Sequence, residues 1–197
     1  MKRKSPLLYR LLKPVYENAA QGMCEECKDF ISRNSKILDL GCGSGIVINE
    51  FKKRFNSEIF GVDIIDNRVI DIPFKKIEGV NLSCFPDNSF DTVMISFVLH
   101  HSEDPVELLK EAKRVAKKNI IIYENLPEGI VSKFFCKIHG ESFAKYFQKN
   151  KETGKFFKRG EWLDIFKKLG LNLIYEQRVS SLINPLKEEL FVVLKGV

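Results

Sequence analysis

The sequence predicts a single α/β domain built on a mostly parallel sheet with helices on both faces. Apolar runs at 37–40, 57–63 and 92–99 are typical of strands that are covered on both faces. Helical patterns alternate with them, at 46–54 and again at 104–116. The chain has 197 residues, of which 44% are hydrophobic and 29% are charged, and this suits one domain with its own core.

Composition limits the compartment and the partners. The net charge of +6 allows an anionic partner, although a solvated lysine-rich surface explains it as well. Five cysteines at irregular spacing do not form a disulfide framework, so we expect free thiols and a cytoplasmic location. Cys24 and Cys27 form a C-x-x-C, but no second pair completes a zinc site. No apolar stretch is long enough for a transmembrane helix.

A glycine-rich turn follows the first predicted strand. Gly41, Gly43 and Gly45 let the backbone turn sharply and approach a ligand with no Cβ in the way. An acid, Asp39, stands at the end of that strand, and the next helix offers free N–H groups at its start. These features predict a ligand site at the turn, although a glycine turn that binds nothing has the same pattern.

A second acid narrows the ligand class. Asp63 ends the next strand, about twenty residues after the glycines, where a dinucleotide-type fold hydrogen-bonds a ribose. Position 46 is Ile, so the third glycine of the G-x-G-x-x-G pyrophosphate fingerprint is missing, and no Lys-Ser/Thr pair ends the loop. The pattern therefore favours another nucleoside cofactor over a nicotinamide or flavin.

Residues 38–45 resemble the first motif of class I S-adenosylmethionine-dependent methyltransferases, hydrophobic-hydrophobic-D-h-G-C-G-x-G. Residues 85–91, F-P-D-N-S-F-D, resemble a stretch of the type 11 methyltransferase group, as do 100–101 and the helix start at 104–105. The resemblance implies a Rossmann-like methyltransferase domain, with a seven-stranded sheet whose last strand is antiparallel, and S-adenosylmethionine as cofactor.

We expect three parts along the chain. Cap helices occupy 1–33, and the methyltransferase domain occupies 34–197 with a helical lid insertion at about 127–159. The family's K-P-G-G turn is replaced by Lys-Lys-Asn at 117–119, which should affect only a surface turn.

The resemblance also implies roles on the cofactor side. Asp39 would bind the ammonium group, and Asp63 would accept both ribose hydroxyls. Ile64 would cover one face of the adenine, with Leu82 or Cys84 on the other. Glu78 would accept from the adenine amino group, with a register open by a residue or two. The implied cofactor-binding set is Asp39, Gly41, Cys42, Gly43, Gly45, Asp63, Ile64, Glu78 and Leu82.

On the acceptor side, His100, His101 and Glu124 are the candidate catalytic residues. All three end central strands, where α/β sheets place ligands, and a histidine titrates near neutrality. Methyl transfer needs a base only if the nucleophile carries a proton, and one histidine that merely packs under the next loop is the alternative. His139 is a weaker candidate. Three histidines and scattered acids give no metal-ligand spacing, so we expect no metal.

Two amphipathic segments flank the site. In the lid, we expect the lysines to face water and the apolar residues to face an acceptor pocket, namely Phe134, Phe135, Ile138, Phe143 and Phe147. An RNA-binding surface is the alternative. In the helical pattern over 5–32, Pro14 should kink or divide the helix. Its apolar face, Leu7, Leu8, Leu11, Leu12, Val15 and Tyr16, is expected to cover the cofactor, with peripheral membrane contact as the alternative.

The function that follows is methyl transfer to a small-molecule or lipid-like acceptor. RNA- or protein-directed methylation, or a non-catalytic cofactor-binding module, are the alternatives. The missing N/D-P-P-Y/F sequence after the fourth strand argues against methylation of exocyclic nucleobase nitrogens. Oligomeric state is not predicted.

Overall fold

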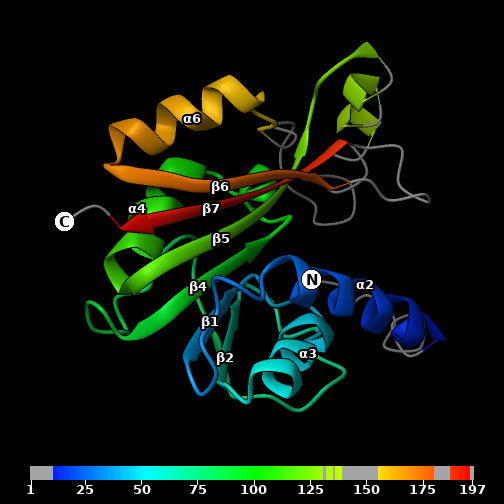
Figure 1. The fold of residues 1–197 in the computed structure, drawn as a ribbon, viewed down its shortest axis with the longest axis vertical. Helices are drawn as coiled ribbons and strands as arrows, with labels where there is room; N and C mark the ends of the chain where they lie inside the picture. The colour runs from blue at the N-terminus through cyan, green and yellow to red at the C-terminus, as the bar shows by residue number, and fades with distance from the viewer. Residues whose placement is uncertain (1–10, 131, 135, 139–154, 180–186, 196–197) are drawn as a thin grey trace.

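The computed structural model describes residues 11–130, 132–134, 136–138, 155–179 and 187–195. A seven-stranded sheet with the order β3-β2-β1-β4-β5-β7-β6 forms the middle of the molecule (Figure 1). Its strands are β1 (Lys36–Leu40), β2 (Glu58–Asp63), β3 (Phe74–Lys76), β4 (Phe90–Ser96), β5 (Ala116–Leu126), β6 (Leu171–Val179) and β7 (Lys187–Lys195). β7 pairs antiparallel with both β5 and β6, whereas the pairs among β1 to β5 are parallel, so the predicted fold class is confirmed.

Helices cover both faces of the sheet. They are α2 (Lys13–Glu26), α3 (Ile46–Phe55), α4 (Pro105–Val115) and α6 (Arg159–Lys168), with a 3₁₀ turn, η1 (Leu99–His101). One hydrophobic core lies under α4 and α6 and a second lies under α2 and α3. Because the central strands are buried on both faces, they read as continuous apolar runs. Within the described residues, no helix combines the length and the apolar character that crossing a bilayer requires.

The α4 helix runs directly into β5. Asp104 caps it by accepting a hydrogen bond from the Glu107 N–H at 2.9 Å, as the sequence predicts. Its C-cap, Ala116, is already the first residue of β5. The expected surface turn at 117–119 is therefore wrong, because these residues lie in the strand. Asn119 fixes it there by accepting from the Thr92 hydroxyl at 2.7 Å.

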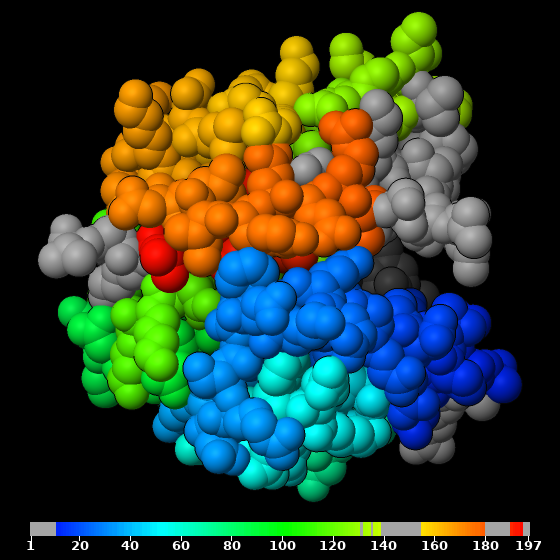
Figure 2. All heavy atoms as spheres, in the orientation of Figure 1, coloured from blue at the N-terminus to red at the C-terminus, as the bar shows by residue number. Residues whose placement is uncertain are grey.

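The N-terminal segment differs from the expected cap. Leu11 is helical and Leu12 is a turn, so the helical pattern is divided just before Pro14, as predicted. Pro14 then lies in the first turn of α2, where its missing N–H costs nothing. The helix buries Ala20 and Cys24 against α3 and the sheet. Leu11 and Val15 are exposed, so this part of the apolar face does not pack on the sheet. Figure 2 shows the start of α2 in dark blue, projecting at the right of the molecule.

Candidate cofactor and acceptor site

The candidate residues gather at one edge of the sheet. Strands β1, β2, β4 and β5 are mutually parallel, so their carboxyl ends meet at the same edge, toward the right in Figure 1. The glycine turn follows β1, Asp63 ends β2, η1 follows β4, and Glu124 lies near the end of β5. Ligands of open α/β sheets bind at this edge.

The three glycines of the turn have different surroundings. Gly41 has φ +83°, and a Cβ there would lie 2.3 Å from Cγ2 of Val98. Gly45 has φ +76°, and a Cβ would lie 3.2 Å from Cδ1 of Ile72. At Gly43 the nearest atom would be a backbone oxygen at 4.0 Å. Packing within the protein thus requires Gly41 and Gly45, whereas Gly43 opens toward space that a ligand could fill.

Asp63 holds this turn in place. Its Oδ2 accepts a hydrogen bond from the Gly43 N–H at 3.0 Å, and its Oδ1 accepts from the Ile65 N–H at 3.2 Å. Burial raises the pKa of Asp63, and these two N–H groups act in the opposite direction. A carboxylate has further lone pairs, so Asp63 can still accept from the two hydroxyls of a ribose.

Asp39 is the most perturbed acid of the site. Its side chain is 3% exposed, and burial, followed by the charge of Asp63, raises its pKa to about 8. A buried acid beside a half-buried acid at one strand edge is costly unless a cation approaches the two. The ammonium and sulfonium of S-adenosylmethionine would supply such a charge beside open Gly43, so the residues present fit this cofactor.

The adenine side agrees only partly with expectation. Ile64 is half-buried, and Glu78 and Cys84 are exposed, so all three are within reach of a ligand. Leu82 has no exposed surface, because its side chain belongs to the core under α4. Its side chain therefore offers no surface to an adenine in this arrangement.

Arg68 orders the loop between Asp63 and β3, a role that the sequence did not reveal. Its guanidinium donates to both carboxylate oxygens of Asp66, at 2.9 and 3.0 Å, and to the Ile72 carbonyl at 2.6 Å. It also lies 4.4 Å from the ring centroid of Phe74. The loop takes the place of a crossover helix and lies against the Gly45 end of the turn.

On the acceptor side, Glu124 acts on other protein groups. Its Oε2 lies 2.6 Å from Nδ1 of His100, and its Oε1 accepts from the Leu99 N–H at 2.9 Å. Neither side chain of the pair is exposed, and Phe156 stacks on His100 with 4.5 Å between ring centroids. Glu124 therefore positions His100 and the η1 turn.

His101 is the more accessible histidine. It is half-buried, and the centroid of its ring lies 4.0 Å from the ring centroid of His100. Just before it, Phe97 has φ +58° and donates its N–H to the Tyr123 carbonyl at 2.8 Å. A bulky residue in the left-handed region is strained, and such strain clusters at functional sites. Sequence reasoning could not find Phe97, because phenylalanine carries no signal for positive φ.

The described part of the lid insertion contradicts one expectation. Phe134 and Ile138 are exposed, so the prediction that they face a pocket is wrong. The side chain of Phe135, together with His139, Phe143 and Phe147, lies outside the described residues.

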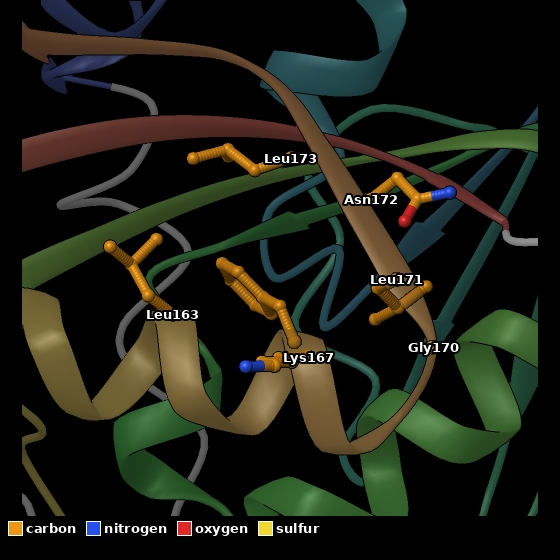
Figure 3. A pocket seen from close by; sticks show the side chains of 7 residues that line it. Leu163, Lys167, Gly170, Leu171, Asn172 and Leu173 are labelled. Carbon is orange, nitrogen blue, oxygen red and sulfur yellow. The ribbon is translucent and has the colours of Figure 1, made fainter.

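Two hollows elsewhere on the surface include none of the predicted site residues. One, of about 300 Å³, lies between α6 and β6, where Leu163 and Lys167 face Leu171 and Leu173 (Figure 3). Because β6 begins at Leu171, this hollow lies at the amino end of the strand, away from the site edge. The other, of about 430 Å³, is lined by the side of α4 near Arg114. Among the residues described, no three His, Cys, Asp or Glu side chains group as metal ligands would.

Comparison with known proteins shows similarity to methyltransferases. Residues 38–123 match the family described as "Methyltransferase domain". An uncharacterized protein of Methanocaldococcus jannaschii is 32% identical over 153 residues, which are 70% of this chain and 64% of that protein. A ubiquinone biosynthesis O-methyltransferase of Pelagibacter ubique is 25% identical over 182 residues, covering 86% of this chain and 73% of that protein.

Coverage differs among the relatives. A bifunctional methionine biosynthesis protein of Rhodopirellula baltica is 28% identical over 51% of this chain, but the match spans 18% of its length. The chain thus spans less than two thirds of this relative and of the Methanocaldococcus jannaschii protein. An S-adenosylmethionine-dependent methyltransferase structure from Aquifex aeolicus superposes with a TM-score of 0.67 at 16% identity, over 98% of this chain and 99% of that one, which shows the shared fold. In sequence, the chain is thus similar to methyltransferase domains over residues 38–123.

Proposed function

We propose that the chain transfers the methyl group of S-adenosylmethionine to a hydroxyl of a small, quinone-like or otherwise lipid-like acceptor. The observation that carries the cofactor half is the group formed by buried Asp39, open Gly43 and Asp63 at one strand edge. The acceptor half is supported by the similarity to a ubiquinone biosynthesis O-methyltransferase.

Asp39 and Asp63 would bind different groups of the cofactor. Asp39 would pair with the ammonium group, and Asp63 would hold the ribose while keeping the turn closed through Gly43. Bound there, S-adenosylmethionine supplies a methyl group on a positively charged sulfur, which any well-placed nucleophile can attack in line. The protein's contribution is then mainly the positioning of donor and acceptor.

A hydroxyl acceptor adds one requirement, since its proton must leave. His101 is the candidate base, because it is accessible and stands at the end of β4 beside the turn that holds Val98 against Gly41. His100 and Glu124 would position it from below through the ring contact and the 2.6 Å pair. Aromatic rings at Phe97 and Phe156 give the surroundings an apolar character that suits a lipid-like ring.

The test follows the label from the donor. The full chain is incubated with methyl-labelled S-adenosylmethionine and cell extract, which is then fractionated into lipid, small-molecule, RNA and protein pools. We expect label in the lipid or small-molecule pool, loss of label with Asp63→Ala, and unchanged labelling with the control Asp71→Asn, whose side chain is exposed in the same loop.

The other outcomes separate the alternatives. Label in RNA or protein would move the acceptor to a macromolecule. Binding of the demethylated cofactor with no label in any pool would indicate a non-catalytic module. If His101→Gln lowered turnover no more than His100→Gln, the assignment of the base to His101 would fail.

A further inference from the structure

The helical segment at 130–138 exposes apolar side chains that an ordinary surface helix would bury. Its described residues 130, 132–134 and 136–138 are helical and follow the end of β5. Ser132 and Cys136 are buried, and the Ser132 hydroxyl donates to the Leu126 carbonyl. The residues turned outward are Ile130, Lys133, Phe134, Lys137 and Ile138, which we call the outer stripe.

The outer stripe combines apolar and basic side chains at helical spacing. Ile130, Phe134 and Ile138 recur every four residues and are 89%, 60% and 42% exposed. Lys133 and Lys137, also exposed, lie between them. A soluble surface helix turns such an apolar stripe inward, so its exposure on an anchored helix marks a contact surface.

A second exposed apolar patch lies at the start of α2. Leu11 is 70% exposed, Val15 is 56% exposed, and Leu12 and Tyr16 are also on the surface. Both the start of α2 and the segment at 130–138 lie toward the right in Figures 1 and 2, the segment at the top and α2 lower down, on the side where β4 and β5 finish.

We propose that this end of the molecule docks on an anionic lipid surface, with the apolar side chains of the outer stripe entering the bilayer boundary and its lysines contacting the headgroups. An interfacial helix has this composition: apolar residues on one side and long basic side chains beside them, which extend toward the phosphates. The inference goes beyond the proposed function, because docking does not depend on which acceptor is methylated.

Two other occupants fit the stripe less well. RNA would use aromatic platforms for its bases, but most of the exposed apolar residues here are aliphatic, and only Phe134 and Tyr16 are aromatic among those described. A second copy packed by two-fold symmetry would bring Lys133 and Lys137 of each chain together without acids on the stripe to pair them. An anionic bilayer satisfies both the apolar and the basic side chains.

Vesicle flotation tests the proposal with the full chain. Vesicles of phosphatidylcholine alone are compared with vesicles of phosphatidylcholine and phosphatidylglycerol, at low and high salt. We expect the chain to float with the anionic vesicles and to bind less at high salt. The triple variant I130S/F134S/I138S should lose about tenfold or more in partitioning. Its matched control, I174S/L194S, changes exposed apolar residues on β6 and β7 and should bind like the parent chain.

Charge is tested separately, so the proposal does not depend on one variant. K133E/K137E should weaken binding to anionic vesicles by about fivefold for each lysine lost. The control K167E/K168E reverses two exposed lysines of α6 and should have no effect. Circular dichroism and light scattering are recorded for every variant.

Four results would overturn the proposal. The first is no flotation with either vesicle. The second is flotation that both stripe variants leave unchanged. The third is a dimer of the parent chain in light scattering that I130S/F134S/I138S dissociates, which would make the stripe a contact between two copies. Tight RNA binding that competes with the vesicles and is lost in K133E/K137E would likewise replace lipid as the partner.

Discussion

Ligand binding should expel a proton from Asp39. In the ligand-free protein its carboxyl has a pKa of about 8, raised by burial and by the charge of Asp63. At pH 7 such a group holds about 0.9 of a proton on average. A bound ammonium favours the carboxylate, so binding at pH 7 should release up to about 0.9 proton, and affinity should rise between pH 6 and pH 8.

Calorimetry with S-adenosylhomocysteine measures this release. Titrations at pH 7 in phosphate and in Tris, which differ in ionisation enthalpy, give the number of protons from the difference in observed heat. Asp39→Asn keeps the shape but does not titrate, so proton release should fall toward zero. Its affinity should also fall by about 1.5–3 kcal/mol, as for a hydrogen bond to a charged group. Equal heats in both buffers, or unchanged release in the variant, would refute the reasoning.

The raised pKa of Asp39 also predicts how the free energy of unfolding changes with pH. Unfolded, Asp39 titrates near 3.8, whereas folded it titrates near 8. Between these two pKa values the folded state holds a proton on Asp39 that the unfolded state has lost. This proton stabilises the folded state fully below the unfolded pKa, and the stabilisation is lost as pH rises through the folded pKa. The free energy of unfolding of the ligand-free chain should fall by roughly 1 kcal/mol for each pH unit in this window, and Asp39→Asn should flatten that slope.

Three further substitutions probe the turn and the N-terminal helix. Gly41→Ala should lower the free energy of unfolding by about 2–4 kcal/mol in urea denaturation, because it combines a left-handed φ with a contact to Val98. Gly43→Ala should cost only about 1–2 kcal/mol of stability, but it should impair cofactor binding more, since its Cβ enters the open space; the reverse ranking would contradict the assignment. Tyr123→Phe removes the hydroxyl that donates to Glu26 at 2.9 Å and should destabilise by about 1–2 kcal/mol in thermal melts, whereas an unchanged Tm would show that α2 docks without it.

The central fold was predictable because its signals are local. The β1 run and its glycine turn have a fixed spacing to Asp63, and the Asp104 cap marks the start of α4 in the sequence itself. The three-residue β3 went unplaced because Phe74–Lys76 is too short to show a period. The strand at 117–119 was not predicted because its two lysines are typical of a surface turn. The contacts that hold Asn119 in the strand come from Thr92 and Phe30, which are distant in the sequence.

The candidate site likewise contains residues that local motifs predict and residues whose positions depend on tertiary contacts. Asp39, Gly43 and Asp63 follow from the motif and its spacing, and the structure brings them to one edge. The burial of Glu124 depends on its contacts with His100 and the η1 turn, which no local pattern records. The outward orientation of the outer stripe likewise depends on which side of the helix Ser132 anchors, and periodicity alone does not give that direction.

The contacts that hold the end of α2 determine when its cysteines become buried during synthesis. The end of α2 and the loop after it contact partners far along the chain: the Tyr123 hydroxyl lies 3.2 Å from Sγ of Cys27, the Asn119 amide donates to the Phe30 carbonyl, and Phe30 packs on Tyr175. A ribosome delivers this segment before its partners. Until residue 175 has emerged, the thiols of Cys24 and Cys27 have no complete core to enter, so the nascent chain exposes them to oxidants and chaperones. Pulse labelling of stalled nascent chains with a thiol reagent should show both cysteines reactive at short lengths and protected once β6 is outside the exit tunnel.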